Sequence, residues 1–198
     1  MAPMRYVMLI AVLGLVGCGE PMDPGSDPVF ANVQFVIACA DGTCAQAVDL
    51  CGNVGEPCDG VPGVAAPAAV TCSAVPTGDV VRLSFEAGGA DTLLTVSDAI
   101  VSAAGGRASG TSCGVGAIES ADADALEGAC GDDLSGDVPP CAITNVQFFD
   151  DEGRPGVQGE IECSELRSSD GRVRVLDGGP SDIGTLPGQF TFIPCGEP

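Results

Sequence analysis

The chain contains no histidine, no lysine and no tryptophan, and its one tyrosine is Tyr6. Without histidine, a Ser-His-Asp or Cys-His catalytic set cannot be assembled, and zinc sites that use histidine are excluded. A carbohydrate-binding platform is disfavoured, because such platforms usually stack sugar rings on tryptophan or tyrosine. Seven phenylalanines are the other aromatic residues.

Positive charge is also scarce. Arg5 is the one charged residue before Cys18, so from Cys18 onward six arginines stand against 28 acidic residues, a net charge of −22. Nucleic-acid binding needs clustered lysine and arginine, so no nucleic-acid partner is expected. Anionic lipid surfaces should repel the protein part. The acidity favours a cationic protein or a divalent ion such as Ca²⁺ as partner, or it simply confers solubility.

A long hydrophobic run is missing as well. The uncharged stretch VMLIAVLGLV covers residues 7–16 and follows Arg5. A membrane-spanning helix needs about 20 apolar residues. A ten-residue apolar core behind a positive charge is typical of a secretory signal peptide.

The signal ends in Leu15-Val16-Gly17-Cys18. This LVGC stretch resembles the lipobox of bacterial lipoproteins, and the resemblance covers about the first 18 residues. It implies that residues 1–17 are cleaved off, that Cys18 carries a diacylglycerol group, and that its new amine is acylated too. The membrane would then be contacted through this N-terminal lipid. Position 19 is Gly rather than the Asp that retains enteric lipoproteins at the inner membrane, which implies the outer membrane, in either leaflet.

Eleven cysteines are present, and Cys18 stands apart from the rest. If Cys18 were an ordinary disulfide partner, one thiol would remain unpaired. Without it the number is even, which suits five disulfides in an oxidising compartment. The alternative is that cysteines bind zinc or an iron–sulfur cluster. However, the four cysteines that follow Cys18 contain no C-x-x-C pair, and export would oxidise their thiols. We therefore expect no cofactor and no metal, and these disulfide candidates: Cys39, Cys44, Cys51, Cys58, Cys72, Cys113, Cys130, Cys141, Cys163 and Cys195.

Beyond Cys18 the sequence changes character twice. Residues 18–28 hold the lipidated cysteine and a stretch with three prolines, which predicts a tether. The following 170 residues show period-two alternation, as at 33–39, 81–85 and 189–192, separated by Gly-, Pro- and Asp-rich turns. This pattern predicts an all-β, disulfide-stapled β-sandwich with little helix, the one helical candidate being residues 117–129.

An internal repeat divides this domain. NVQF occurs at 32–35 and 145–148, residues 70–83 align with 161–175, and Cys-Gly follows at 113–114 and 195–196. The repeat predicts a first β half at 29–116 with a Cys-rich insertion, an acidic connecting loop at 117–141, and a second half at 142–198. We expect two halves of one sandwich; two small separate sandwiches are the alternative.

The repeat also predicts disulfide pairs. If equivalent cysteines pair equivalently, Cys72–Cys113 and Cys163–Cys195 each close one half. Cys130–Cys141 would then close the acidic loop, and the four cysteines of the insertion would form two bridges among themselves.

Two acidic groups in the connecting loop offer oxygen ligands for calcium: Asp122, Asp124 and Glu127, and Asp132, Asp133 and Asp137. Neither group has the spacing of an EF-hand loop. We interpret the segment as a solvated acidic loop.

These features predict a membrane-anchored envelope lipoprotein whose non-catalytic β-sandwich serves binding or structural interaction. One alternative is a carrier of lipid or another small hydrophobic ligand, with a lumen between the sheets. The other is a secreted hydrolase that uses two carboxylates, although no spacing marks a pair and we nominate no catalytic residue.

Overall fold

The computed structural model describes residues 28–60, 63–120, 123–131, 138–181 and 184–196, and within these ranges every regular element is a β-strand. The all-β prediction is confirmed. No helix that could cross a membrane is found in the described ranges. The strands are β1 (Phe30–Cys39), β2 (Ala45–Asn53), β3 (Glu56–Pro57), β4 (Ala69–Thr77), β5 (Val80–Gly88), β6 (Leu93–Ser102), β7 (Gly114–Ile118), β8 (Leu126–Ala129), β9 (Cys141–Asp151), β10 (Arg154–Ser168), β11 (Val173–Asp177), β12 (Pro180–Ser181), β13 (Gly184–Thr185) and β14 (Gly188–Ile193).

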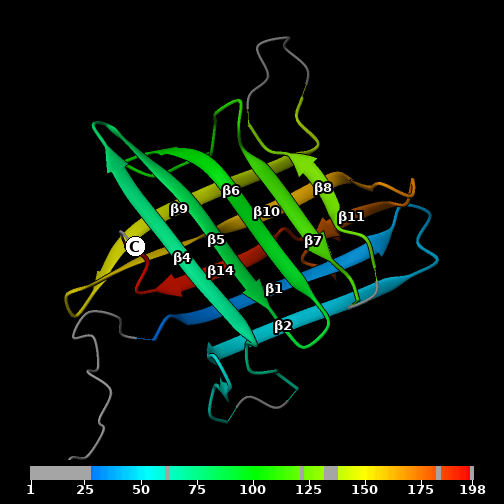
Figure 1. Ribbon diagram of the computed structural model, residues 1–198, viewed down its shortest axis with the longest axis horizontal. Helices are drawn as coiled ribbons and strands as arrows, with labels where there is room; N and C mark the ends of the chain where they lie inside the picture. The colour runs from blue at the N-terminus through cyan, green and yellow to red at the C-terminus, as the bar shows by residue number, and fades with distance from the viewer. Residues whose placement is uncertain (1–27, 61–62, 121–122, 132–137, 182–183, 197–198) are drawn as a thin grey trace, which may run out of the picture.

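One antiparallel sheet folds over itself into two layers (Figure 1). The front layer contains β4 to β8, and the back layer contains β2, β1, β14, β11, β10 and β9, whose strands cross behind the front ones. The long strand β10 connects the layers. Its first part pairs with β9 and β14, and its last residues, Arg167 and Ser168, pair with Glu127 and Leu126 of β8.

Strands β11 and β14 lie end to end at one strand position of the back layer, between β1 and β10. Both are antiparallel to β1 on one side and to β10 on the other, and the excursion at residues 178–187 separates them. The excursion is closed at its base, where Gly178 N donates to Leu186 O at 2.6 Å. The back layer therefore stays continuous although the chain leaves it.

The core lies between the two layers and follows the predicted alternation. Val33, Phe35 and Ile37 of β1 are at most 2% exposed, while the residues between them are not buried. At the centre, the rings of Phe85, Phe190 and Phe192 have centroids 4.7 to 6.1 Å apart. These three phenylalanines join the front strand β5 to the back strand β14.

The helix expected at residues 117–129 is absent, and that prediction is wrong. Its described residues belong to the β7–β8 hairpin, in which Ala117 pairs with Leu126. Both side chains are buried under the front layer. The packing of these alternate residues outweighs the helix propensity of alanine and leucine.

The ten cysteines after Cys18 form five disulfides. The two bridges expected within the insertion are confirmed, since Cys39 pairs with Cys44 and Cys51 with Cys58. The other three join Cys72 to Cys195, Cys113 to Cys130 and Cys141 to Cys163.

The predicted pair Cys72–Cys113 is wrong because of strand order. Cys72 lies on β4, and β5 and β6 separate β4 from β7, which Cys113 precedes. Cys113 instead bonds to Cys130 across the β7–β8 hairpin, where Cys130 N donates to Cys113 O at 3.0 Å.

The predicted pairs Cys163–Cys195 and Cys130–Cys141 are wrong for a related reason. Cys141 lies directly opposite Cys163 in the β9–β10 ladder, with Cα atoms 3.9 Å apart. Cys195 follows β14 and meets β4, where Ser73 and Gly196 form a parallel bridge. A cysteine's cross-strand neighbour, and not its place in the repeat, decides its partner.

The two NVQF motifs lie on β1 and β9, which are both in the back layer. Strands from residues 29–116 and from 142–198 thus share one hydrogen-bonded sheet. The front layer is formed by residues 69–129. The halves of the repeat do not coincide with the two layers.

Candidate functional site

The sequence-derived site residues fall in different parts of the chain. The lipobox residues 15–18 lie outside the described ranges, as do four of the proposed calcium ligands, Asp122, Asp132, Asp133 and Asp137. Asp124 accepts a hydrogen bond from Ser169 Oγ at 2.7 Å, and Glu127 lies on β8. No cluster of three potential metal ligands occurs among the residues that the structure describes.

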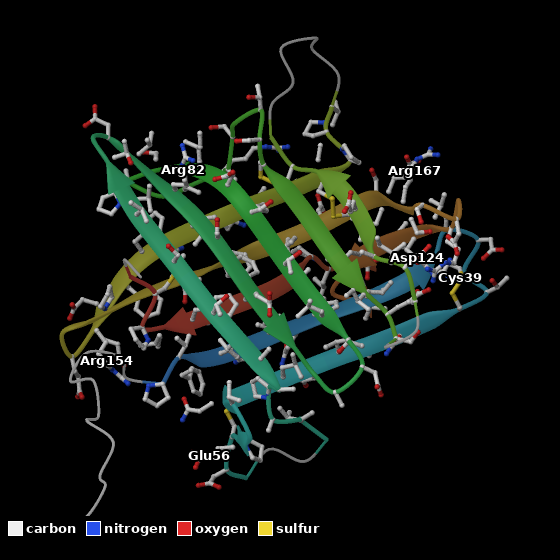
Figure 2. The ribbon with its side chains drawn as sticks, in the orientation of Figure 1. Cys39, Glu56, Arg82, Asp124, Arg154 and Arg167 are labelled. Carbon is white, nitrogen blue, oxygen red and sulfur yellow. A yellow bond between two sulfur atoms is a disulfide. The ribbon has the colours of Figure 1, made fainter. Side chains whose placement is uncertain are left out.

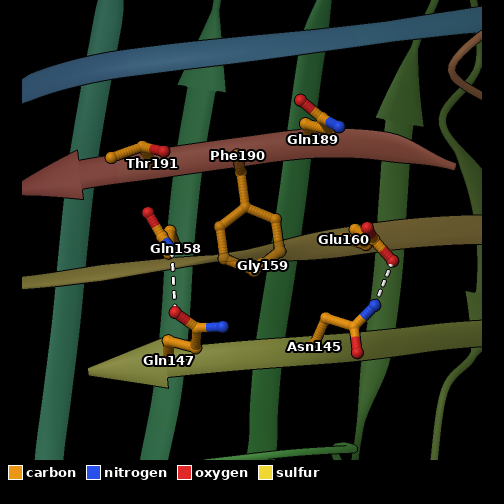
Figure 3. A pocket seen from close by; sticks show the side chains of 8 residues that line it. All are labelled: Asn145, Gln147, Gln158, Gly159, Glu160, Gln189, Phe190 and Thr191. Carbon is orange, nitrogen blue, oxygen red and sulfur yellow. Dashed lines mark hydrogen bonds between the residues drawn. The ribbon is translucent and has the colours of Figure 1, made fainter. Parts of the chain in front are cut away.

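The outer face of the back layer carries a group of hydrogen-bonding side chains, neutral except for Glu160, that the sequence analysis did not single out. Those from β14, β10 and β9 surround a shallow depression (Figure 3), and two more on β1 lie beside them, opposite residues of β14. We call the group the amide face: Asn32, Gln34, Asn145, Gln147, Gln158, Glu160, Gln189 and Thr191.

Strand register arranges the amide face in two rows that cross the layer. In one row Gln147 is opposite Gln158, Gln158 opposite Thr191, and Thr191 opposite Asn32. In the other, Glu160 is opposite Gln189, and Gln189 is opposite Gln34. Adjacent strands lie about 4.8 Å apart, so each row presents polar groups at short, regular intervals.

Hydrogen bonds hold several of these side chains in place. Gln158 Nε2 donates to Gln147 Oε1 at 3.0 Å, and Asn145 Nδ2 donates to Glu160 Oε2 at 2.6 Å (Figure 3). A carboxamide has two donors and an acceptor oxygen with two lone pairs, so each pair leaves donors and acceptors directed outward. The face is therefore both ordered and able to bind a polar ligand.

A glycine creates the depression in the middle of the amide face. A Cβ atom at Gly159 would lie 2.7 Å from Cζ of Phe190, whose ring packs beneath it in the core. Opposite Gly159, strand β9 contains a bulge, and Asn145 adopts a positive φ of 52° there. Asparagine tolerates this conformation better than most residues, and the bulge turns the Asn145 amide toward Glu160.

One edge of the amide face is apolar. Phe149 of β9 is opposite Gly156 of β10, where a Cβ atom would lie 2.5 Å from the Phe149 ring. The ring therefore covers Gly156, which is buried, while Phe149 itself stays partly exposed. Ile193 and Phe30, paired across β14 and β1, continue this edge with partly exposed side chains.

A charged network lies at the end of the molecule where β11 begins. Glu119 Oε2 accepts from Arg174 Nε at 2.8 Å, Glu119 Oε1 accepts from Arg174 Nη2 at 3.0 Å, and Arg172 also binds Glu119. The side chains of Glu119 and Arg174 are 17% exposed. Because Glu119 follows β7 of the front layer and Arg174 belongs to the back layer, this network ties the layers together.

Two exposed turns near this network hold carboxylates with lowered pKa values. The Ser168 hydroxyl and then the Arg172 backbone N–H bind Asp170 and lower the pKa of its carboxyl group. In the β1–β2 turn, the hydroxyl and backbone N–H of Thr43 lower the pKa of Asp41. Asp124, Arg167 and Cys39 lie at this end, and Arg154 lies at the opposite one (Figure 2).

No protein-family model matches the chain, and no curated protein or solved structure shows a significant similarity to it. The geometry described above is thus the basis for assigning a function.

The amide face had a signal in the sequence. In NVQF, the hydrophobic residues mark the inward positions, and Asn and Gln occupy the outward ones in both copies. Considering the polar half of each alternation would have found Asn32, Gln34, Asn145 and Gln147. Their meeting with Gln158 and Gln189 depends on strand order, which the motif does not contain.

Proposed function

We propose that this protein is a lipid-anchored lipoprotein of the bacterial cell envelope, in the outer membrane, and that its β-sandwich is a non-catalytic binding module. The amide face is its binding surface. The N-terminal lipid holds the protein at the membrane, and the Pro-rich tether at residues 19–28 separates the module from the lipid.

The observation that carries this proposal is the use of the cysteines. Every cysteine in the described part of the chain is paired with another one there, so the folded module offers Cys18 no partner. Five disulfides favour an oxidising compartment. An exported chain with one cysteine left over, placed at the end of an LVGC stretch, is what lipid attachment at Cys18 requires.

The binding role is supported by the composition of the amide face. A catalytic carboxylate pair would require two acids facing the same depression. Of the residues that line it, Glu160 is the one with a carboxylate. A lipid carrier would need an internal cavity, whereas Phe85, Phe190 and Phe192 occupy the centre between the layers.

The anchor is tested with Cys18→Ser in cells that are fed radioactive palmitate. We expect the label to be lost and the protein to leave the membrane fraction. The control is the double variant Cys39→Ser/Cys44→Ser, which also removes cysteines but should keep both label and location. A Cys18→Ser protein that stays in the membrane fraction without label contradicts the proposal.

A further inference from the structure

We infer that the amide face binds an extended neutral glycan chain. This inference rests on the proposed function, because it names the ligand class of the same binding surface. The sequence alone disfavours such a ligand, since tryptophan and tyrosine are missing from the mature chain. The structure supplies a different apolar platform.

The first argument concerns hydrogen-bonding chemistry. Seven of the eight side chains of the amide face are neutral amides or a hydroxyl. Sugar hydroxyls donate and accept at once, and carboxamides offer both functions. Glu160, fixed by Asn145, adds a charged acceptor for hydroxyl donors.

The second argument concerns charge. From Cys18 onward the chain has six arginines and 28 acids, yet Glu160 is the one acid among the eight residues of the amide face, and a second carboxylate, Asp49 of β2, borders the face and accepts a hydrogen bond from Gln34 at 3.3 Å. The face holds no arginine, so an anionic polymer would find no cation to pair with. A cationic protein would find far more carboxylates elsewhere on the molecule. A neutral, hydroxyl-rich partner fits this surface best.

The third argument concerns the apolar edge. Sugar rings present C–H groups on their faces, and an aromatic ring binds such a face by stacking. Phe149 lies over Gly156, two residues along the strands from the Gln147–Gln158 pair and on the same face. A partly exposed ring thus lies next to amide groups on one flat surface. This combination allows a sugar unit to stack while its neighbours hydrogen bond.

The shape suits a chain rather than a single sugar. The amide face spans four adjacent strands in two rows, and its depression at Gly159 is shallow and open. A small molecule binds best in a concave pocket that buries most of its surface. A flat, repeating surface instead gains from many weak contacts along an extended ligand.

The test uses the full lipid-modified chain in detergent, titrated by calorimetry with two probes. These are the hexasaccharides of β-1,4-linked N-acetylglucosamine and of β-1,4-linked glucose. We expect at least one of the two hexasaccharides to bind with a dissociation constant below about 1 mM. The variant Gln158→Ala/Gln189→Ala should weaken binding about tenfold, because each lost hydrogen bond contributes a fraction of that factor.

Two further variants sharpen the test. Phe149→Leu keeps an apolar side chain but removes the ring, and should weaken binding about threefold to tenfold. Gln46→Ala, at an exposed amide near the start of β2 and outside the face, should leave affinity unchanged. Thermal unfolding of every variant shows whether it is folded.

Three outcomes overturn the inference. One is absence of binding to both probes, and another is binding that Gln158→Ala/Gln189→Ala leaves unchanged. The third is a change in oligomeric state on mutating the face, measured by sedimentation velocity, because the face would then contact a second copy of the chain. If glycans fail but the face variants abolish capture of an envelope protein, the proposed binding function stands and its ligand class is wrong.

Discussion

Cys72 and Cys195 are 123 residues apart in the sequence, and their disulfide joins β4 of the front layer to the segment that follows β14 of the back layer. The other four disulfides connect residues separated by 5 to 22 positions. Cys72–Cys195 is therefore the cross-link that most restricts the unfolded chain.

The double variant Cys72→Ser/Cys195→Ser should lose about 4 to 5 kcal/mol of unfolding free energy, by the loop-entropy estimate for a loop of this length. The matched control is Cys39→Ser/Cys44→Ser, which removes a disulfide that closes a far shorter loop. It should lose about 2 kcal/mol of unfolding free energy. Urea unfolding, followed by circular dichroism, measures both. Equal losses for the two variants would show that loop length does not set the stabilisation.

Gly159→Ala should destabilise the protein by about 1 to 3 kcal/mol, because the new methyl group would press on the Phe190 ring. The double variant Gly159→Ala/Phe190→Leu replaces the ring by a smaller side chain. Its loss of unfolding free energy should be less than the sum of the losses of the two single variants. Gly196→Ala is the control, since its Cβ would meet Pro155 Cγ at 3.6 Å, an ordinary contact. Chemical denaturation of the four variants gives the coupling. Additive losses would mean that the ring and the glycine do not constrain each other.

Glu119→Gln should lower the denaturation midpoint, because Arg174 and Arg172 would lose the carboxylate that both bind. Glu165→Gln is the control. Its partner Arg167 is 67% exposed, and exposed pairs contribute little. The midpoint of the control should remain near that of the wild type. If the two variants lost equal stability, the network would not tie the layers together.

Thr43→Val should raise the pKa of Asp41, since the Thr43 hydroxyl is the main cause of its lowered value. A carboxyl group whose pKa is lower in the folded state stabilises the fold above its unfolded pKa, and this stabilisation is lost as the pH falls through the folded-state value. The wild type should therefore be more stable than Thr43→Val near neutral pH and lose that advantage in acid. NMR titration of Asp41, with Asp170 as an unaffected reference, measures the change. A fixed Asp41 pKa would assign the shift to the backbone N–H alone.

The sequence predicted the strands well and the cysteine partners poorly. Alternation is local, so residues such as Val33, Phe35 and Ile37 mark the buried side of β1 without any knowledge of its neighbours. The partner of Cys72 depends on which segment lies beside an edge strand, and that segment comes from the far end of the chain. For the four cysteines of the insertion the sequence predicted two bridges among themselves but not the pairing, which the structure gives as Cys39–Cys44 and Cys51–Cys58.

The internal repeat likewise predicted local strand structure but not which strands pair. It identified NVQF as a strand twice, and β1 and β9 are the result. It failed as a guide to pairing because β9 pairs with β10, whereas β1 does not pair with β4. Similar segments have similar local structure, but their neighbours need not correspond. The amide face was missed for the same reason, since Gln158 and Gln147 meet through the β9–β10 register.

The excursion between β11 and β14 has a practical use. Its two ends are hydrogen-bonded to each other at Gly178 and Leu186, and β14 pairs with β1 directly after it. We expect a reporter or epitope inserted between β12 and β13 to leave the register of β11 and β14 unchanged, because the excursion is closed at its base. The position offers protein engineers a display site on this scaffold.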